Sequence, residues 1–142
     1  MRYVAQMTPI GELRGRDAIY LDSVVVGDSC NTLTLTGEFN GALATIPQGA
    51  KWHAYRLEFK GVIAFQVTEL EAWQPACHGE WPRSSFDEIL ESPWKESLSG
   101  PMSSVREVHR HVCLLTYDRV FDVLSQSCEL VLTGQRDLAP KV

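Results

Sequence analysis

Polar and apolar side chains alternate along WHAYRLEFKGVIAFQVTELEAW, the segment from Trp52 to Trp73, and this alternation constrains the fold more than any other feature. Every second residue from His53 to Phe59 belongs to one side of an extended chain, and most of these side chains are apolar or aromatic. Because strand side chains alternate between the two faces of a sheet, the pattern predicts a half-buried strand. Gly61 then predicts a turn, a bulge or a close backbone approach before the apolar run Val62–Val67. We expect this segment to form the centre of an antiparallel sheet.

Two further β-prone segments precede it in the chain. Ile19–Val26 is rich in branched side chains, and Thr32–Phe39 alternates between apolar residues and threonine or glutamate. The connection Gly27–Asn31 is dense in turn-forming residues. The pattern predicts a β-hairpin with one buried face and one threonine-rich face. Residues 1–16 show little periodicity and are predicted to form a loop or a loosely held entry segment.

The C-terminal half predicts more strands and a helix. Val105–Tyr117 is apolar enough for a strand, and Val120–Val131 for two short strands or one bent strand. Ser85–Glu88 fits a helical capping box, and apolar residues follow it at helical spacing. Pro93 either ends that helix or, after Ser92, begins a second short helical turn.

Together these elements predict a single domain that spans residues 1–142. Six to seven strands follow one another in hairpin-like order, with one short helix near residues 85–98, so the expected class is mainly β, with α+β left open. Strands and helices do not alternate, which argues against a parallel sheet. We expect an antiparallel sheet that is curled into a barrel or folded into a sandwich.

Charge and composition exclude several functions. The net charge of −5 and a pI near 5.3, with no basic run, argue against nucleic-acid binding, because phosphate contacts need a concentrated basic face. The longest apolar run is far too short to span a membrane, so no membrane role is expected. The N-terminal residues lack the apolar core of a secretory signal, and the four cysteines form no C-x-x-C pair. These features predict a cytoplasmic protein with reduced thiols.

One short segment, residues 24–29, resembles a catalytic motif. Residues 24–29, VVVGDS, resemble the opening block of the GDSL hydrolases, and that resemblance would make Ser29 the nucleophile. That family continues with a helix after the serine and supplies its base from a late D-x-x-H block. Here the residues after Ser29 alternate with a period of two, and no histidine follows an aspartate at that spacing. A hairpin turn is therefore the preferred interpretation of this string.

A second string carries potential metal ligands. His109, His111 and Cys113 occupy every second position, so a strand would place two imidazoles and a thiol on one face. Cys77-His78 could supply a fourth ligand. Structural zinc sites usually contain short, turn-based ligand pairs, which this string lacks. The three residues are candidates only, and no cofactor is expected.

The end of the central segment is the third candidate. The alternation continues past the apolar residues, and the same face of the predicted strand then carries Glu69, Glu71 and Trp73. That face therefore becomes acidic toward its end. These side chains are either solvated or line a cleft mouth together with Trp81. We predict that partner or ligand binding, if any, involves this end of the segment.

Four stretches, LDSVVV…TLTLTGEF, YRLEFKGV, SSFDEIL and CLLTYDRVFDVL, resemble small bacterial domains of the YxiG-like and immunity-protein kind. The resemblance covers residues from about Asp22 to Leu132. It implies a cytosolic, non-catalytic bacterial domain that binds and neutralises a partner protein. It assigns no functional residue in this chain.

Two functions follow as hypotheses. The leading hypothesis is a non-enzymatic binding domain for a protein partner, as in immunity proteins, or for a small ligand. The alternative is a small hydrolase or metal-dependent enzyme that uses Ser29 or the face formed by His109, His111 and Cys113. The sequence leaves the oligomeric state open.

Overall fold

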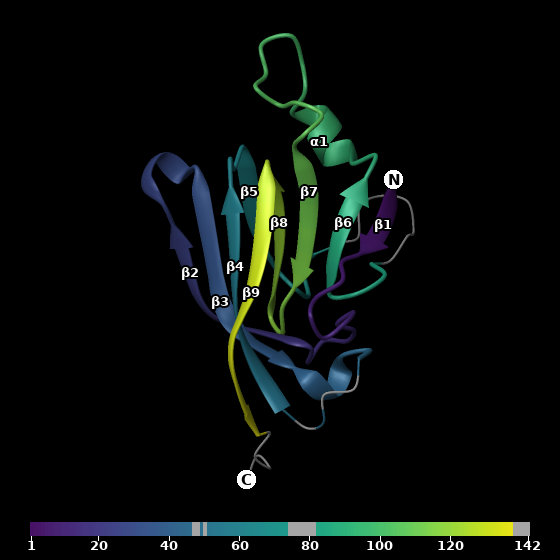
Figure 1. The fold of residues 1–142 in the computed structure, drawn as a ribbon. Coiled ribbons are helices and arrows are strands. Elements are labelled where there is room, and N and C mark those ends of the chain that lie inside the picture. Colours follow the sequence, from purple (N-terminus) through teal and green to yellow (C-terminus); the bar gives the residue numbers. More distant parts are fainter. Residues whose placement is uncertain (47–48, 50, 74–81, 138–142) are drawn as a thin grey trace.

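The computed structural model describes residues 1–46, 49, 51–73 and 82–137, and its strands form two antiparallel sheets (Figure 1). The five-stranded sheet has the order β1 (Arg2–Ala5), β6 (Phe86–Leu90), β7 (Arg110–Leu115), β8 (Arg119–Ser125) and β5 (Ala64–Glu69). The four-stranded sheet has the order β2 (Ile19–Val26), β3 (Thr32–Asn40), β4 (Lys51–Lys60) and β9 (Ser127–Asp137). The helical elements are the 3-10 turns η1 (Asp28–Cys30) and η2 (Gly41–Leu43) and the short helix α1 (Pro93–Ser97).

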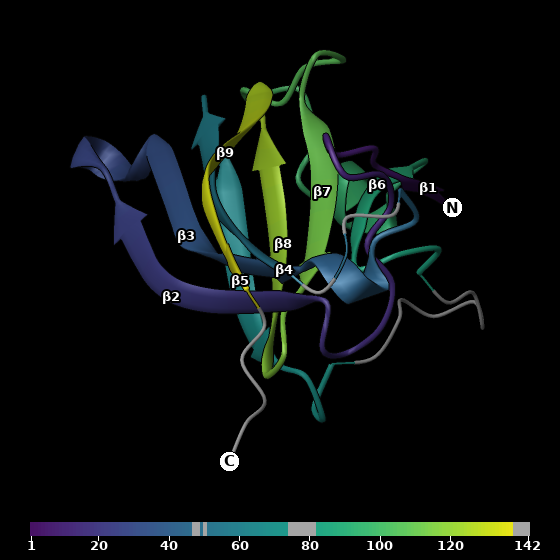
Figure 2. The same ribbon diagram turned by 60° about the horizontal axis from the view of Figure 1, so that its bottom comes forward.

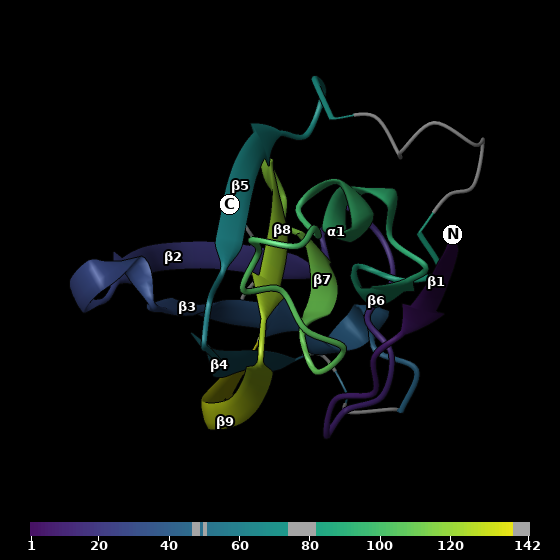
Figure 3. The same cartoon turned by 90° about the horizontal axis from the view of Figure 1, so that it is seen from above.

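The two sheets pack face to face as a sandwich, which settles the choice between barrel and sandwich. β2 crosses the strands of the five-stranded sheet in Figures 2 and 3, so the sheets are strongly rotated relative to each other. The mainly β, antiparallel class is confirmed, with nine strands among the described residues instead of six or seven. The core between the sheets is continuous, and its fully buried members include Leu33, Leu35, Phe39, Tyr55, Leu57, Phe59, Leu114 and Phe121.

The central strand lies where the alternation predicted it. β4 pairs with β3 on one side and β9 on the other, and Tyr55, Leu57 and Phe59 are almost completely buried. Burial of each such side chain contributes about 2 kcal/mol of hydrophobic free energy. The β2–β3 hairpin is also confirmed, with Gly27–Asn31 as its loop.

Two neighbouring crossovers join the sheets. Gly61 carries the chain from β4 into β5 with φ +63, and Gln126 carries it from β8 into β9. The Gln126 N–H lies 3.0 Å from the Lys60 carbonyl oxygen and 3.1 Å from that of Gly61. Val62–Val67 therefore does not extend β4 within its own sheet but begins the edge strand of the other sheet.

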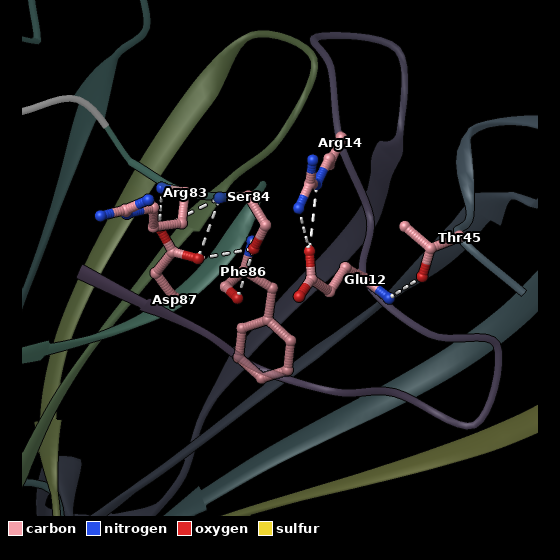
Figure 4. Close-up of polar contacts among 7 residues, drawn as sticks. All are labelled: Glu12, Arg14, Thr45, Arg83, Ser84, Phe86 and Asp87. Carbon is pink, nitrogen blue, oxygen red and sulfur yellow. Dashed lines mark hydrogen bonds and ion pairs between the residues drawn. The ribbon is translucent and has the colours of Figure 1, made fainter.

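The capping-box prediction for Ser85–Glu88 is wrong, because these residues lead into and form strand β6. Asp87 is fully buried, and its carboxylate accepts hydrogen bonds from the backbone N–H groups of Arg83, at 2.6 Å, and Ser84, at 3.1 Å (Figure 4). These bonds fold residues 83–85 into a bend directly before the strand, in competition with a helical start. The helix expected near residues 85–98 is α1, which begins only at Pro93.

The N-terminal loop prediction is also wrong in part. Arg2–Ala5 forms β1, which pairs with β6 at the edge of the five-stranded sheet. The following residues are held by a Glu12–Arg14 ion pair and by the Glu12 N–H, which donates to Thr45 Oγ1 (Figure 4). In the described part of the chain, no helix is long and apolar enough to cross a membrane.

The outer face of the five-stranded sheet, turned away from β2–β4, carries a second and smaller apolar cluster. Its buried members are Tyr3, Ile89, Cys113 and Val120. Trp73 and Leu70, from the turn after β5, pack against it. Helix α1 lies over β7 on the side away from β9 (Figure 3). This second layer positions the candidate site.

Candidate functional site

A pocket of about 250 Å³ lies between α1, the turn after β5 and the outer face of the five-stranded sheet. Its wall combines aromatic side chains with a small number of polar ones, as small-molecule sites usually do. The lining residues are Met1, Tyr3, Gln66, Thr68, Ala72, Trp73, Ile89, Ser92, Pro93, Trp94, His111 and Asp122.

A chain of hydrogen bonds forms the polar floor of this pocket. Ser92 Oγ lies 2.7 Å from His111 Nδ1, and His111 Nε2 lies 2.7 Å from Asp122 Oδ1. All three residues are buried, with exposed fractions of 3%, 6% and 4%. The indole N–H of Trp73 donates to the second Asp122 oxygen at 3.3 Å.

The sheet register brings these residues together. Cys113 of β7 pairs with Asp122 of β8, so both side chains point to the outer face. His111 lies two residues before Cys113 and shares that face, diagonal to Asp122. Ser92 is the N-cap of α1, and its hydroxyl oxygen accepts a hydrogen bond from the Lys95 N–H at 3.1 Å.

The hydrogen bonds of this chain connect Ser92 to Asp122 through the two nitrogens of one imidazole. The Ser92 oxygen accepts the Lys95 N–H, and its own proton can be donated to His111 Nδ1. In that arrangement the Nε2–H of His111 donates to Asp122.

The environment of Asp122 also affects the ionisation of the neighbouring Cys113 thiol. Burial, followed by the nearby carboxylates of Asp122 and Asp87, raises the pKa of the Cys113 thiol well above its ordinary value. The thiol is therefore protonated and unreactive at neutral pH. Cys113 does not line the pocket, and it contributes apolar bulk beneath it instead of a nucleophile.

Aromatic rings surround the polar floor. Trp94 packs edge-on against His111, with ring centroids 4.9 Å apart and an interplanar angle of 62°. Trp73 closes the opposite wall, and Tyr3 of β1 contributes a third ring. Trp94 comes from α1 and Trp73 from the turn after β5, and both segments cover the sheet. The pocket therefore depends on α1 and on this turn.

The residues predicted at the end of the central segment separate in the structure. β5 ends at Glu69, whose carbonyl oxygen accepts the N–H groups of Ala72 and Trp73 at 2.9 Å each. This turn brings Trp73 to the outer face of the sheet, whereas a continued strand would have kept it in line with Phe65 and Val67, so the prediction of an unbroken strand is wrong. Glu69 and Glu71 are exposed and do not line the pocket. Trp81 lies outside the described residues, as do Cys77 and His78.

The predicted histidine–cysteine face is only partly a strand face. His111 and Cys113 belong to β7, while His109 precedes it, and His109 Nδ1 accepts the Arg106 N–H at 2.8 Å. Within the described ranges, no group of three His, Cys, Asp or Glu side chains is arranged to hold a metal ion. Ser29 lies in the exposed β2–β3 loop with φ 59, far along the chain from the pocket residues.

A larger hollow of about 690 Å³ lies on the other side of α1 and shares Ile89, Ser92 and His111 with the pocket. Two of its basic side chains already have partners. Arg110 pairs with Glu88, and Lys95 Nζ donates to the His109 carbonyl oxygen at 2.6 Å. This hollow lacks the aromatic wall of the smaller pocket, which is therefore the stronger candidate site.

Sequence reasoning missed Ser92 and Asp122 as site residues. Asp122 did carry a signal, because it is a lone carboxylate inside the otherwise apolar run VFDVL of a strand that is buried on both faces. A buried aspartate in such a strand requires partners. The sequence did indicate a helical turn after Ser92, which is α1, but neither the strand register that brings His111 beside Asp122 nor the packing of α1 on the sheet is visible in the sequence.

Comparisons with protein-family models, with curated proteins and with solved structures found no match to this chain. The geometry of the pocket is therefore the basis for a functional proposal.

Proposed function

We propose that this protein is a non-enzymatic binding domain that takes a small ligand into the pocket under α1. The observation that carries the proposal is the buried Ser92–His111–Asp122 chain at the floor of an aromatic-lined pocket. A pocket of this kind, with few and convergent polar groups, is the usual form of a small-molecule site. Its volume of about 250 Å³ limits the ligand to a small molecule.

The proposal is tested by closing the pocket without disturbing the rest of the fold. Thr68 lies on the outer face of β5 and lines the pocket, so Thr68→Phe places a ring inside it. Val67 is the neighbouring residue, 47% exposed on the opposite face of the same strand, and Val67→Phe is the matched control. A ligand-observed NMR screen of small fragments should find binders for the wild type and for Val67→Phe that Thr68→Phe loses. Equal binding to all three proteins, or no binder for the wild type, would contradict the proposal.

A serine hydrolase is the second candidate function, because serine, histidine and aspartate are connected in the order of a catalytic triad. Three features favour binding over catalysis. The Ser92 oxygen is used as a helix cap, and the imidazole presents Nδ1 to the serine and Nε2 to the aspartate, the reverse of the usual triad. The residue after the serine is Pro93, which has no N–H to donate to an oxyanion.

A fluorophosphonate probe, which reacts with activated serines, separates the two functions. The binding proposal predicts no more labelling of the native protein than of Ser92→Ala. Labelling confined to Ser92 and abolished by both Ser92→Ala and Asp122→Asn would establish the hydrolase instead. Ser97, an exposed serine of the same helix, provides the control variant Ser97→Ala.

The protein-partner version of the binding hypothesis stays a prediction, as do a bacterial origin and a cytoplasmic location. The resemblance to immunity proteins supports this version. It predicts a toxin encoded next to this protein and a stable complex between the two in size-exclusion chromatography. A pocket-filling Thr68→Phe variant that still forms the complex would place the partner surface away from the small-ligand pocket.

A further inference from the structure

We infer that the ligand of this pocket is a small organic cation, such as a quaternary or primary ammonium compound. The inference rests on the proposed function and specifies its ligand class. It combines two independent features of the site, which are the buried carboxyl group of Asp122 and the aromatic rings around it.

The first feature is a buried carboxyl group, that of Asp122, in a pocket whose described lining contains no lysine or arginine. Asp122 receives hydrogen bonds from the Nε2–H of His111 and the indole N–H of Trp73. Met1 also lines the pocket, and its amine is paired with Glu91 at 3.6 Å. Burying a carboxylate is costly, and a cation bound in the pocket would offset part of that cost.

The second feature is the aromatic wall. Trp73, Trp94 and Tyr3 line the same pocket as the carboxylate, and the face of an aromatic ring attracts a cation that has lost its water. Tryptophan, which supplies two of these three rings, attracts cations more strongly than tyrosine does. Aromatic rings beside one carboxylate form the arrangement that recognises alkylammonium groups. The described pocket lining offers an anion no lysine or arginine.

Three molecules of nearly the same shape test the ligand charge. Choline is the cation, 3,3-dimethylbutan-1-ol is its neutral carbon isostere, and 3,3-dimethylbutanoate is an anion of similar size. In NMR titrations at neutral pH, choline should bind the wild type at least about tenfold more tightly than the alcohol, and the anion most weakly. Tetramethylammonium and ethylammonium extend the cation set.

Asp122→Asn should weaken choline binding at least about tenfold while changing the affinity for the alcohol less than about threefold. Glu71→Gln is the matched control, because it removes an exposed carboxylate outside the pocket and should leave both affinities unchanged. Thermal unfolding checks that Asp122→Asn is folded. Trp94→Leu, which keeps apolar bulk but removes a ring, is the second variant and should also weaken choline more than the alcohol.

The outcomes separate this inference from the proposed function. Tighter binding of the alcohol or the anion, or equal binding of all three molecules, would overturn the cation inference and leave the pocket as a ligand site. The cation inference would also be overturned if no cation binds with a Kd below about 10 mM. The pocket would still be a ligand site if other fragments bind the wild type and do not bind Thr68→Phe. Failure of every fragment and every cation to bind would overturn the proposed function itself.

Discussion

Asp87 shows at the level of one residue how a carboxylate can determine local structure. Its side chain is fully buried and accepts hydrogen bonds from Arg83 and Ser84, which closes the turn before β6. Burial, the largest effect, raises the pKa of Asp87 above its ordinary value of 3.8, although the hydrogen bonds from Ser84 and Arg83 act in the opposite direction. The same residue that prevents a helical start at Ser85 therefore also makes the fold sensitive to pH.

The sign of this pH dependence follows from proton linkage. A carboxyl group with a raised pKa in the folded state binds its proton more tightly there than in the unfolded chain. Its contribution to stability is therefore largest below pH 3.8 and falls as the pH rises through the raised folded pKa. We expect the difference in unfolding free energy, wild type minus Asp87→Asn, to fall as the pH increases across this window. Denaturant unfolding at several pH values measures it.

Glu107→Gln is the control for this series, since it removes the same charge at an exposed position. Its unfolding free energy should differ from that of the wild type by a nearly constant amount over the same pH range. A wild-type minus Asp87→Asn difference that stays flat or rises with pH would show that burial does not dominate at Asp87.

At the level of elements, Gly61 determines how the central segment is divided between the two sheets. The alternation of residues 53–59 was sufficient to predict β4, because one face of that strand is buried and the other is not. The end of β5 was not predictable in the same way, since the residues around Glu69–Trp73 continue the same alternation through a turn. β6 was missed because Ser85–Glu88 has the composition of a helix start and becomes a strand through its pairing with β1 and β7.

Gly61→Ala should reduce the unfolding free energy by about 1–3 kcal/mol, because a side chain is strained at positive φ. A β-carbon at this position would also lie 2.7 Å from the side chain of Gln126, in the neighbouring crossover. Gly100→Ala is the control, since nothing lies within 4 Å of the β-carbon it would add. Denaturant unfolding should show a change within about 0.5 kcal/mol for the control. Equal stability of the two variants would mean that the crossover does not require glycine.

At the level of the whole molecule, the sandwich and the candidate site follow from different kinds of information. The core between the sheets depends on polarity patterns within single segments, which the sequence displays. The pocket depends on side chains that come from β7, β8, α1 and the turn after β5. Trp73 was predicted as a binding residue, whereas Ser92 and Asp122 were not, because their contact with His111 arises only after the sheet is paired and α1 is in place.

The tryptophans allow the binding proposal to be tested in one experiment. Trp73 and Trp94 line the pocket, whereas Trp52 is buried on the four-stranded sheet beside Tyr20 and Arg136. In a ¹H–¹⁵N NMR titration with the tightest binder among choline and the screened fragments, the indole N–H signals of Trp73 and Trp94 should shift to saturation together. The Trp52 signal should stay in place. Saturable binding that shifts Trp52, or that leaves Trp73 and Trp94 unchanged, would contradict a ligand site between α1 and the outer face of the five-stranded sheet.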